Sequence, residues 1–246
     1  MIRNYNDFVE ALLTAGFTMA GSADGIYAIA PWESGAHRPG DSPIVWHTGC
    51  PDTDPWEWRT RVLEERDDIA YGKLFFKKCG YVTKEWYPYF LATRRGGDTF
   101  EDAYKSGTIS HAAKRVYEVV LDKQILPSHE IKLLAGFTKE EKSAFERALV
   151  ELQMKMFITI CGGRQKISKK GDGHGIPSAV FCTTENFFRP QDLPAELGFF
   201  IDQDDVFEKA ANLSIDQAYD AIRARVLKLN PMADEKTIKK FISAKQ

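Results

Sequence analysis

The chain has 246 residues, of which 43% are hydrophobic and 28% charged, and its formal net charge is −2. This composition is typical of a globular protein that can bury a core of its own, and the net charge excludes a polycation. No segment approaches the ~20 apolar residues that a membrane span needs, and the polar N-terminus lacks the pattern of a signal peptide. We therefore expect a cytoplasmic protein without a membrane partner.

The charge is unevenly distributed along the chain. Residues 101–190 carry 14 basic and 11 acidic side chains, residues 1–100 carry 11 and 14, and residues 191–246 carry 8 and 10. Only the middle segment has a net positive charge. An excess of three charges weakly favours a nucleic-acid surface in this segment and equally fits chance.

The first hundred residues predict short elements joined by loops. Hydrophobic spacing and turn residues indicate, in chain order, a helix over 6–15, strands over 26–30 and 44–48, and helices over 55–67 and 84–93. Asp54 is a good N-cap for the second of these helices, since Pro55 fits the first helical position. Thr83 is the expected cap of the third helix. The aromatic and lysine-containing segment 71–82 fits more than one state, and its structure is left open.

A break at residues 94–98, rich in arginine and glycine, predicts a domain boundary. We expect a tryptophan-rich N-terminal α+β domain over 1–97, a second domain over 98–190 and a C-terminal helical region over 191–246. All five tryptophans precede the break, which suggests one aromatic core or one pocket. The core is the stronger interpretation, because aromatic side chains gain much free energy from burial.

The second domain has the element order of a winged helix-turn-helix module. Helices are expected over 109–123, 128–135 and 139–154, followed by strands over 157–161 and 179–183. Thr138 and Glu141 have the spacing of a capping box at the start of the third helix. The sequence therefore predicts an α+β, mainly helical protein with a winged helix and short β-hairpins, and duplex DNA as its partner.

In this interpretation the third helix enters the major groove and the loop between the two strands is the wing. Lysine and arginine side chains neutralise phosphates. The candidate DNA contacts lie on the third helix and in the wing; they are Lys142, Arg147, Arg164, Lys166, Lys169 and Lys170. Against this, the third helix carries as many acidic as basic residues. The alternative is a solvated loop on a module that packs against other domains.

The C-terminal region predicts three helices, over 202–211, 215–229 and 234–244. Ser214 is the expected cap of the long middle helix. The last helix has a basic face, formed by Lys236, Lys239, Lys240 and Lys245. Solvated charge is favoured for this face over a phosphate contact.

Four segments carry a resemblance to a known family: 46–49 (WHTG), 54–59 (DPWEWR), 63–73 (LEERDDIAYGK) and 84–90 (KEWYPYF). In these segments the chain resembles bacterial proteins described as AlkZ-related. Their name points, more distantly, to the AlkZ-like DNA glycosylases, which are built from tandem winged-helix domains and release alkylated bases or act on cross-links. The resemblance implies winged-helix character and a role in DNA repair.

The chain departs from the glycosylases at their catalytic motif. These enzymes carry Gln-x-Gln or Gln-x-Asp in their N-terminal part, whereas the first hundred residues here contain no glutamine. A literal Gln203-Asp204-Asp205 occurs late, at an expected helix start, where its carboxylates suit the helix dipole. We interpret it as chance.

The N-terminal domain contains one candidate catalytic constellation. Acidic residues and a histidine occur beside tryptophans, which could stack a flipped base while a carboxylate positions water. The residues concerned are His47, Asp52, Asp54 and Glu57 as catalytic candidates, and Trp46, Trp56 and Trp58 as pocket aromatics. The favoured alternative is that the carboxylates only cap a helix and the tryptophans fill a core.

No metal or cofactor site is predicted. The four cysteines and the remaining histidines have no zinc-ligand spacing, and the glycine-rich segments do not open a helix after a strand, as a dinucleotide site requires. Cys161 and Cys182 are expected to be buried neighbours on paired strands, without a disulfide.

Three functions are compatible with these observations. The first is a DNA-binding winged-helix protein without catalysis, with damage recognition as one role. The second is a divergent DNA glycosylase, and the third is a winged-helix scaffold that binds a protein or a small ligand in the tryptophan-rich half. The sequence names no lesion, ligand or oligomeric state.

Overall fold

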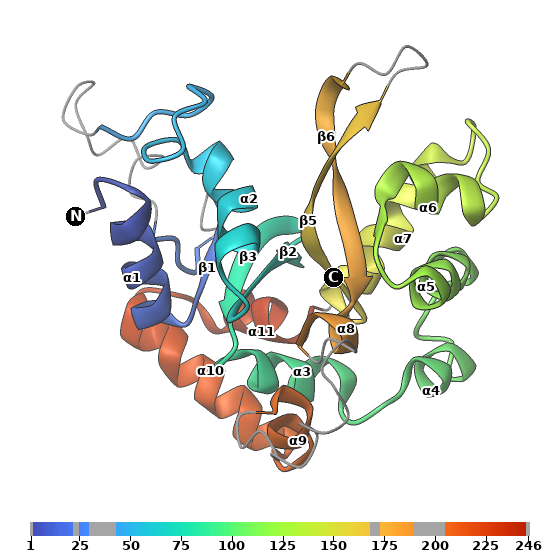
Figure 1. Ribbon diagram of the computed structural model, residues 1–246. Coiled ribbons are helices and arrows are strands. Elements are labelled where there is room, and N and C mark those ends of the chain that lie inside the picture. The colour runs from blue at the N-terminus through green and yellow to red at the C-terminus, as the bar shows by residue number, and fades with distance from the viewer. Residues whose placement is uncertain (1, 22–24, 30–42, 168–172, 189–204, 245–246) are drawn as a thin grey trace, which may run out of the picture. The chain divides into compact units, whose positions relative to one another are not determined.

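The computed structural model describes residues 2–21, 25–29, 43–167, 173–188 and 205–244, without the side chains of residues 166–176 (Figure 1). The fold is α+β, and its paired strands are antiparallel. The chain divides into two compact units: residues 1–97 with 206–246, and residues 98–205. Every helix in the described part is too short or too polar to cross a membrane.

The first unit, called the tryptophan unit below, combines the two ends of the chain. Its elements are α1 (Tyr5–Ala15), β1 (Phe17–Met19), α2 (Pro55–Glu65), β2 (Ile69–Phe75), β3 (Lys78–Thr83), α3 (Tyr87–Arg95), α9 (Val206–Ala211), α10 (Ile215–Leu229) and α11 (Glu235–Ser243). The three strands pair in the order β1-β3-β2.

Helix α1 forms where the sequence predicts it, because both of its ends are specified locally. Asn4 accepts a hydrogen bond from the amide of Asp7 at 2.9 Å. Gly16 ends the helix with φ +89°, a conformation that costs glycine little. The buried face includes Phe8 and Leu12, as their spacing indicates.

Segment 71–82, left open above, is most of a β-hairpin. Strands β2 and β3 pair so that Tyr71 lies opposite Tyr81. Gly80 allows close packing here, since a Cβ at this position would lie 2.6 Å from Phe75 and 2.8 Å from the Thr18 carbonyl oxygen.

The strands predicted over 26–30 and 44–48 are wrong wherever the chain is described, because these residues form turns and loop. Ile26, Ile29 and Ile44 are nevertheless buried. Their apolar character reflects side chains that anchor loops to the core rather than a ladder of backbone hydrogen bonds.

The C-terminal helices pack on α3, and α10 also lies beside α1 (Figure 1). Arg94, near the end of α3, connects them to the sheet. Its guanidinium donates to the carbonyl of Leu74 at 2.9 Å and to those of Phe241 and Ile242, both at 3.0 Å. The last two carbonyls lie in the final turn of α11, where a helix lacks internal donors.

Three predicted helices begin three or more residues later than expected. Residues 84–86 form a turn and α3 starts at Tyr87, since Pro88 is tolerated only in a first helical turn. Helix α9 starts at Val206; of the four residues predicted before it, only Asp205 is described, and it is not helical. The third, α7, is described with its unit below.

The second unit, called the hairpin unit below, is continuous in sequence. Its elements are α4 (Phe100–Lys105), α5 (His111–Lys123), β4 (Leu126–Pro127), α6 (Ser128–Leu134), α7 (Lys142–Met154), β5 (Ile158–Ile167), β6 (Gly173–Thr183) and α8 (Thr184–Phe188). The strands pair in the order β5-β6-β4. The hairpin of β5 and β6 is longer than the two short strands predicted.

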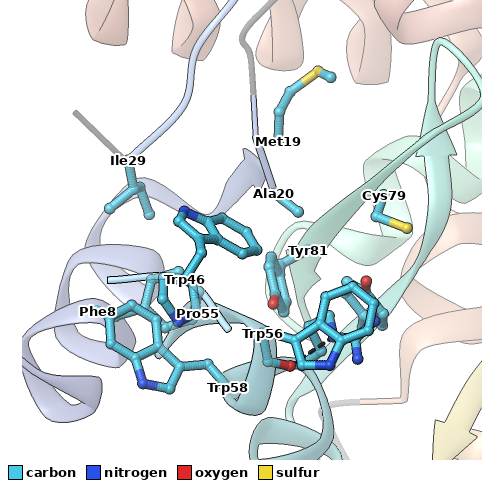
Figure 2. A pocket seen from close by; sticks show the side chains of 12 residues that line it. Phe8, Met19, Ala20, Ile29, Trp46, Pro55, Trp56, Trp58, Cys79 and Tyr81 are labelled. Carbon is cyan, nitrogen blue, oxygen red and sulfur yellow. Dashed lines mark hydrogen bonds between the residues drawn. The ribbon is translucent and has the colours of Figure 1, made fainter. Parts of the chain in front are cut away.

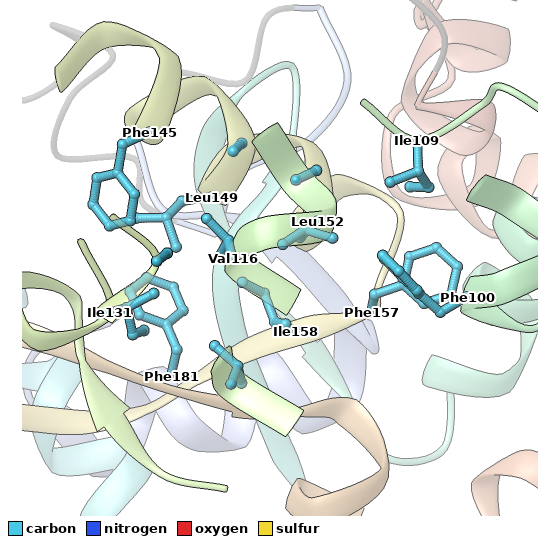
Figure 3. Packing of buried hydrophobic residues seen from close by; sticks show 14 of the residues in the cluster. Phe100, Ile109, Val116, Ile131, Phe145, Leu149, Leu152, Phe157, Ile158 and Phe181 are labelled. Atoms are coloured by element: carbon cyan, nitrogen blue, oxygen red, sulfur yellow. The ribbon is translucent and has the colours of Figure 1, made fainter. Parts of the chain in front are cut away.

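One core holds the hairpin unit together (Figure 3). Phe145 and Leu149 of α7 pack in it with Ile131 of α6 and Phe181 of β6. At its other end, Phe100 of α4 contributes a ring to the same cluster. Helices α4 to α7 thus share one apolar cluster with the hairpin.

The capping box predicted at Thr138 forms, but α7 begins three residues later than expected. The Thr138 amide donates to the Glu141 carboxylate at 2.9 Å, and the Glu141 amide to the Thr138 hydroxyl at 3.4 Å. These bonds close a separate turn, and the α-helix starts at Lys142. Helix α6 has Pro127 at its N-cap position, so Ser128 is its first residue rather than its cap.

Candidate functional site

An apolar pocket of about 200 Å³ lies within the tryptophan unit (Figure 2). Aromatic rings dominate its lining, and they come from α1, α2, β2, β3 and the loop before α2. The lining residues are Phe8, Met19, Ala20, Ile29, Trp46, Pro55, Trp56, Trp58, Arg59, Tyr71, Cys79 and Tyr81. All three tryptophans predicted as pocket aromatics are among them.

The three tryptophans differ in burial and therefore in the role they can take. Trp58 is 1% exposed and stacks on Phe8 with ring centroids 5.0 Å apart, so it belongs to the core and forms the pocket floor. Trp46 and Trp56 are half-buried. Core and pocket, the alternatives left by the sequence, are thus both present in one cluster.

Asp54 fixes the loop that carries Trp46 next to the helix that carries Trp56. Its carboxylate is fully buried and accepts four backbone hydrogen bonds. Oδ1 accepts from the amides of His47 at 3.0 Å and Trp56 at 2.8 Å. Oδ2 accepts from the amides of Thr48 at 2.8 Å and Gly49 at 2.9 Å.

These bonds determine the charge state of the carboxylate. Burial by itself raises the pKa of Asp54, but the four amides outweigh it and hold that pKa below its ordinary value. Asp54 is therefore an ionised structural group whose acceptor positions are occupied. A general base needs a free lone pair within reach of a proton, which this carboxylate lacks.

The other candidate catalytic residues do not converge on the pocket. Asp52 is exposed and forms a loose ion pair with Arg61 at 3.9 Å. The imidazole of His47 is exposed and lies against the Trp56 ring, with centroids 4.9 Å apart. Neither they nor Glu57 line the pocket, and no carboxylate does so among the described residues.

The polar groups that do line the pocket were missed by the sequence reasoning. Arg59 lies with its guanidinium carbon 3.3 Å from the centroid of the Trp56 ring, and its Nε donates to the Trp56 carbonyl at 2.6 Å. The spacing of three residues on α2 is the signal that places the two on one face. Burial, followed by the neighbouring Cys79, raises the pKa of Tyr81, so this phenol stays neutral.

The hairpin unit holds the second candidate site, around the turn between α6 and α7. Arg115 of α5 fixes this turn: its guanidinium donates to the Ala135 carbonyl at 2.8 and 3.1 Å and lies 4.0 Å from the centroid of the Phe137 ring. Gly136 between them has φ +70°. The same arginine pairs with Glu141 at 3.4 Å.

The predicted DNA contacts are only partly described. Lys142 and Arg147 are exposed on α7; Lys142 pairs with Glu146 at 3.7 Å, and Arg147 donates to the Ser143 hydroxyl at 2.6 Å. Arg164 is exposed on β5 and lies 3.8 Å from Glu130. The side chain of Lys166, and Lys169 and Lys170 entirely, lie outside the described residues.

The remaining expectations concern cysteines, metals and the literal glutamine motif. All four cysteines are free. Cys182 is buried, with Cys161 beside it on the paired strand. No group of side chains that could hold a metal occurs among the described residues. Gln203 and Asp204 lie outside the described residues.

A protein-family model described as AlkZ related matches residues 2–243, so the chain belongs to the AlkZ-related family. Membership of this family suggests a role related to DNA repair. No curated protein and no solved structure matches the chain.

Proposed function

We propose that this AlkZ-related protein is a winged-helix protein that binds duplex DNA through its hairpin unit and recognises damaged DNA without releasing a base. Helix α7 enters the major groove, and the hairpin of β5 and β6 lies along the phosphate backbone. The pairing of β4 with β6 is the observation that carries the proposal. Leu126 lies opposite Phe181 and Pro127 opposite Val180.

This pairing matters because it gives the hairpin unit the strand order expected of a winged helix. The order α5, β4, α6, α7, β5, β6, with the short strand β4 at the edge of the hairpin, is that of a winged helix. A helix-turn-helix needs a short and fixed turn, so that the second helix protrudes toward the groove. Arg115 supplies this fixation through its two bonds to Ala135 and its contact with Phe137.

Acidic residues on α7 and at its N-cap were the main objection to groove binding, and two of them, Glu151 and Glu141, have internal partners. Glu151 accepts from the Ser110 amide at 2.8 Å and from the Ser110 hydroxyl at 2.6 Å. The Glu141 carboxylate accepts a hydrogen bond from the Thr138 amide and forms an ion pair with Arg115. These carboxylates therefore stabilise the unit itself, which lessens their effect on a groove-facing surface.

The exposed cations at the start of α7 support phosphate contacts. The Lys142 and Arg147 side chains meet only surface partners, and an exposed ion pair contributes little, so exchange for a phosphate costs little. Phosphate binding releases counterions, so the affinity for DNA should fall steeply with salt. Arg164 and the lysines of the hairpin loop would add contacts of the same kind.

Fluorescence anisotropy with a labelled duplex at several salt concentrations tests the proposal. Each phosphate contact contributes roughly −0.9 to the slope of log affinity against log salt. Arg147→Ala and Lys142→Ala should each reduce the magnitude of that slope by about one and weaken binding to all duplexes alike. Replacing the four basic hairpin residues together by alanine should abolish binding above the non-specific level.

Lys123→Ala is the matched control. Lys123 is an exposed lysine at the end of α5 that pairs with Asp122 at 2.9 Å, and it lies outside the proposed surface. Its replacement should leave the affinity and the salt slope unchanged. Absence of binding at low salt, or equal losses for the control and the α7 variants, would contradict the proposal.

Damage recognition needs its own comparison. A duplex with one abasic site should bind more tightly than the intact duplex of the same sequence, with a preference that persists as salt rises. Equal affinity for both duplexes would leave DNA binding but remove damage recognition. Release of an alkylated base would contradict the proposed absence of catalysis and favour the glycosylase alternative.

A further inference from the structure

The geometry points to a second binding site, independent of the proposed DNA contact: the aromatic pocket of the tryptophan unit binds a small planar aromatic carboxylate. The ring system lies among Trp46, Trp56 and Tyr81 (Figure 2), and the carboxylate meets the guanidinium of Arg59. The pocket and its charged group belong to one unit, so the site does not depend on the hairpin unit.

The lining favours a flat apolar ring. Six of the twelve lining residues are aromatic, and two of these, Tyr71 and Tyr81, contact each other with centroids 4.8 Å apart. Aromatic pairs prefer stacked or edge-to-face contacts, which a planar ligand can extend. A dry cavity of roughly 150 Å³ is known to hold benzene, so about 200 Å³ suits one ring or two fused rings.

The charge of the lining selects the substituent. Arg59 is half-buried, and its only hydrogen bond is the one from Nε to the Trp56 carbonyl, so neither Nη atom has a partner among the described residues. The lining also lacks a carboxylate there. A guanidinium fork matches a carboxylate geometrically, whereas a cationic ligand would meet an uncompensated like charge.

A second donor points to the same chemistry. The indole nitrogen of Trp46 is buried and has no hydrogen-bond partner within the described chain. A buried donor without a partner costs about 1–3 kcal/mol. A ligand oxygen can remove this cost, so the Arg59 guanidinium and the Trp46 indole both favour a ligand that carries acceptors.

Stacking holds Arg59 in place for this task. Its guanidinium lies over the Trp56 ring, which limits the rotamers that a free arginine would sample. Arg61, two residues further along the same helix, stacks on Tyr5 in a similar way at 3.9 Å. Arg61 differs in pairing with Glu65 at 2.8 Å and in lying outside the pocket, so it provides a matched control.

Isothermal titration calorimetry with three ligands of one ring system tests the inference. Indole-3-acetate is an anion, indole is neutral and tryptamine is a cation, so their comparison isolates the charge. Indole-3-acetate should bind at least ten-fold more tightly than indole, and tryptamine more weakly than both. Equal affinities, or tighter binding of tryptamine, would overturn the selection of a carboxylate, and no heat with any of the three would overturn the site.

Variants then assign the effect to the pocket. Arg59→Leu should reduce the affinity for indole-3-acetate to that of indole and leave indole within about two-fold, whereas Arg59→Lys should restore part of the preference. Ala20→Leu fills the pocket and should weaken the binding of both ligands. Arg61→Leu should change neither, and an equal loss in Arg61→Leu would place binding at the surface and refute the site.

Discussion

Asp54 offers the sharpest test of how the pocket is held open. Asparagine keeps the shape of this side chain and is as good a helix N-cap as aspartate. It replaces one carboxylate oxygen by an amide group that donates, however, and each oxygen of Asp54 faces two backbone N–H groups. In Asp54→Asn, two backbone donors therefore face a donor, and the loop over 47–49 loses part of its connection to residue 54.

The magnitude follows from the number of bonds lost. A hydrogen bond to a charged group contributes about 1.5–3 kcal/mol, which gives roughly 3–6 kcal/mol for two. Thr48 and Gly49 are exposed, so water can replace part of the lost acceptor. We expect Asp54→Asn to lower the free energy of unfolding by about 3 kcal/mol, which corresponds to a fall in Tm of roughly 6–12 °C.

The tryptophans provide the assay. Residues 32, 46, 56, 58 and 86 all belong to the tryptophan unit, so indole fluorescence during urea unfolding reports on that unit alone. Asp52→Asn is the matched control, because its carboxylate is exposed and forms only the loose ion pair with Arg61. The control should change stability by less than about 0.5 kcal/mol. A change of less than about 0.5 kcal/mol in the free energy of unfolding of Asp54→Asn would refute the structural role assigned to Asp54.

The same carboxylate makes stability depend on pH in a predictable direction. Because the fold lowers the pKa of Asp54, its contribution is complete above the unfolded value of about 3.9 and is lost as the pH falls through the lower folded value. Asp54→Asn has no such titration. The difference between the parent protein and the variant should therefore be constant near neutral pH and narrow below about pH 4.

Three further substitutions test other contacts. Arg94→Met should lower the free energy of unfolding by about 3 kcal/mol in the same fluorescence assay, since it leaves three carbonyls without their donor. Gly80→Ala should lower the free energy of unfolding by about 1–3 kcal/mol in that assay, because the added Cβ clashes with the neighbouring strand. Gly162→Ala is the control: a Cβ there meets open space, so the free energy of unfolding followed by circular dichroism should change by less than about 0.5 kcal/mol. Glu151→Gln should cost about 1 kcal/mol in thermal unfolding followed by circular dichroism, because it weakens the bonds to Ser110; an unchanged Tm would contradict this contact.

The parts of the fold that the sequence predicts well are those whose causes lie within a few residues. Helix α10 runs from Ile215 to Leu229, as predicted, because a capping box defines its start. The Ser214 hydroxyl accepts from the Gln217 backbone amide at 3.1 Å, and the Gln217 side-chain oxygen accepts from the Ser214 backbone amide at 3.0 Å. Asn4 and Gly16 define α1 in the same local way. The order of helices α5, α6 and α7 and strands β5 and β6 in the hairpin unit also follows from short patterns.

The parts that the sequence misses depend on distant partners. Strand β4 has two residues, and only its pairing with Phe181 and Val180, more than fifty positions away, makes it a strand. The isoleucines of the predicted strands over 26–30 and 44–48 find burial in loops instead. Hydrophobic spacing indicates which side chains are buried. It does not indicate whether the backbone of these residues pairs with another strand, or with which one.

In the candidate site, Asp54 has both kinds of partner: one lies two residues away on α2, and the others lie in a preceding loop. Asp54 was recognised as a cap because Pro55, which suits a first helical position, follows it directly, and the bond to the Trp56 amide is present. Its other three partners come from the loop over 47–49, of which the sequence assigned the first two residues to a strand. Those amides change the chemistry, because they occupy the lone pairs that a catalytic carboxylate needs and leave Arg59 as the only full charge on the described pocket lining. The acid-containing pocket, which the sequence offered as the less favoured alternative, is thus a pocket with one cationic side chain, and the ligand that we propose for it is an aromatic acid rather than a base awaiting hydrolysis.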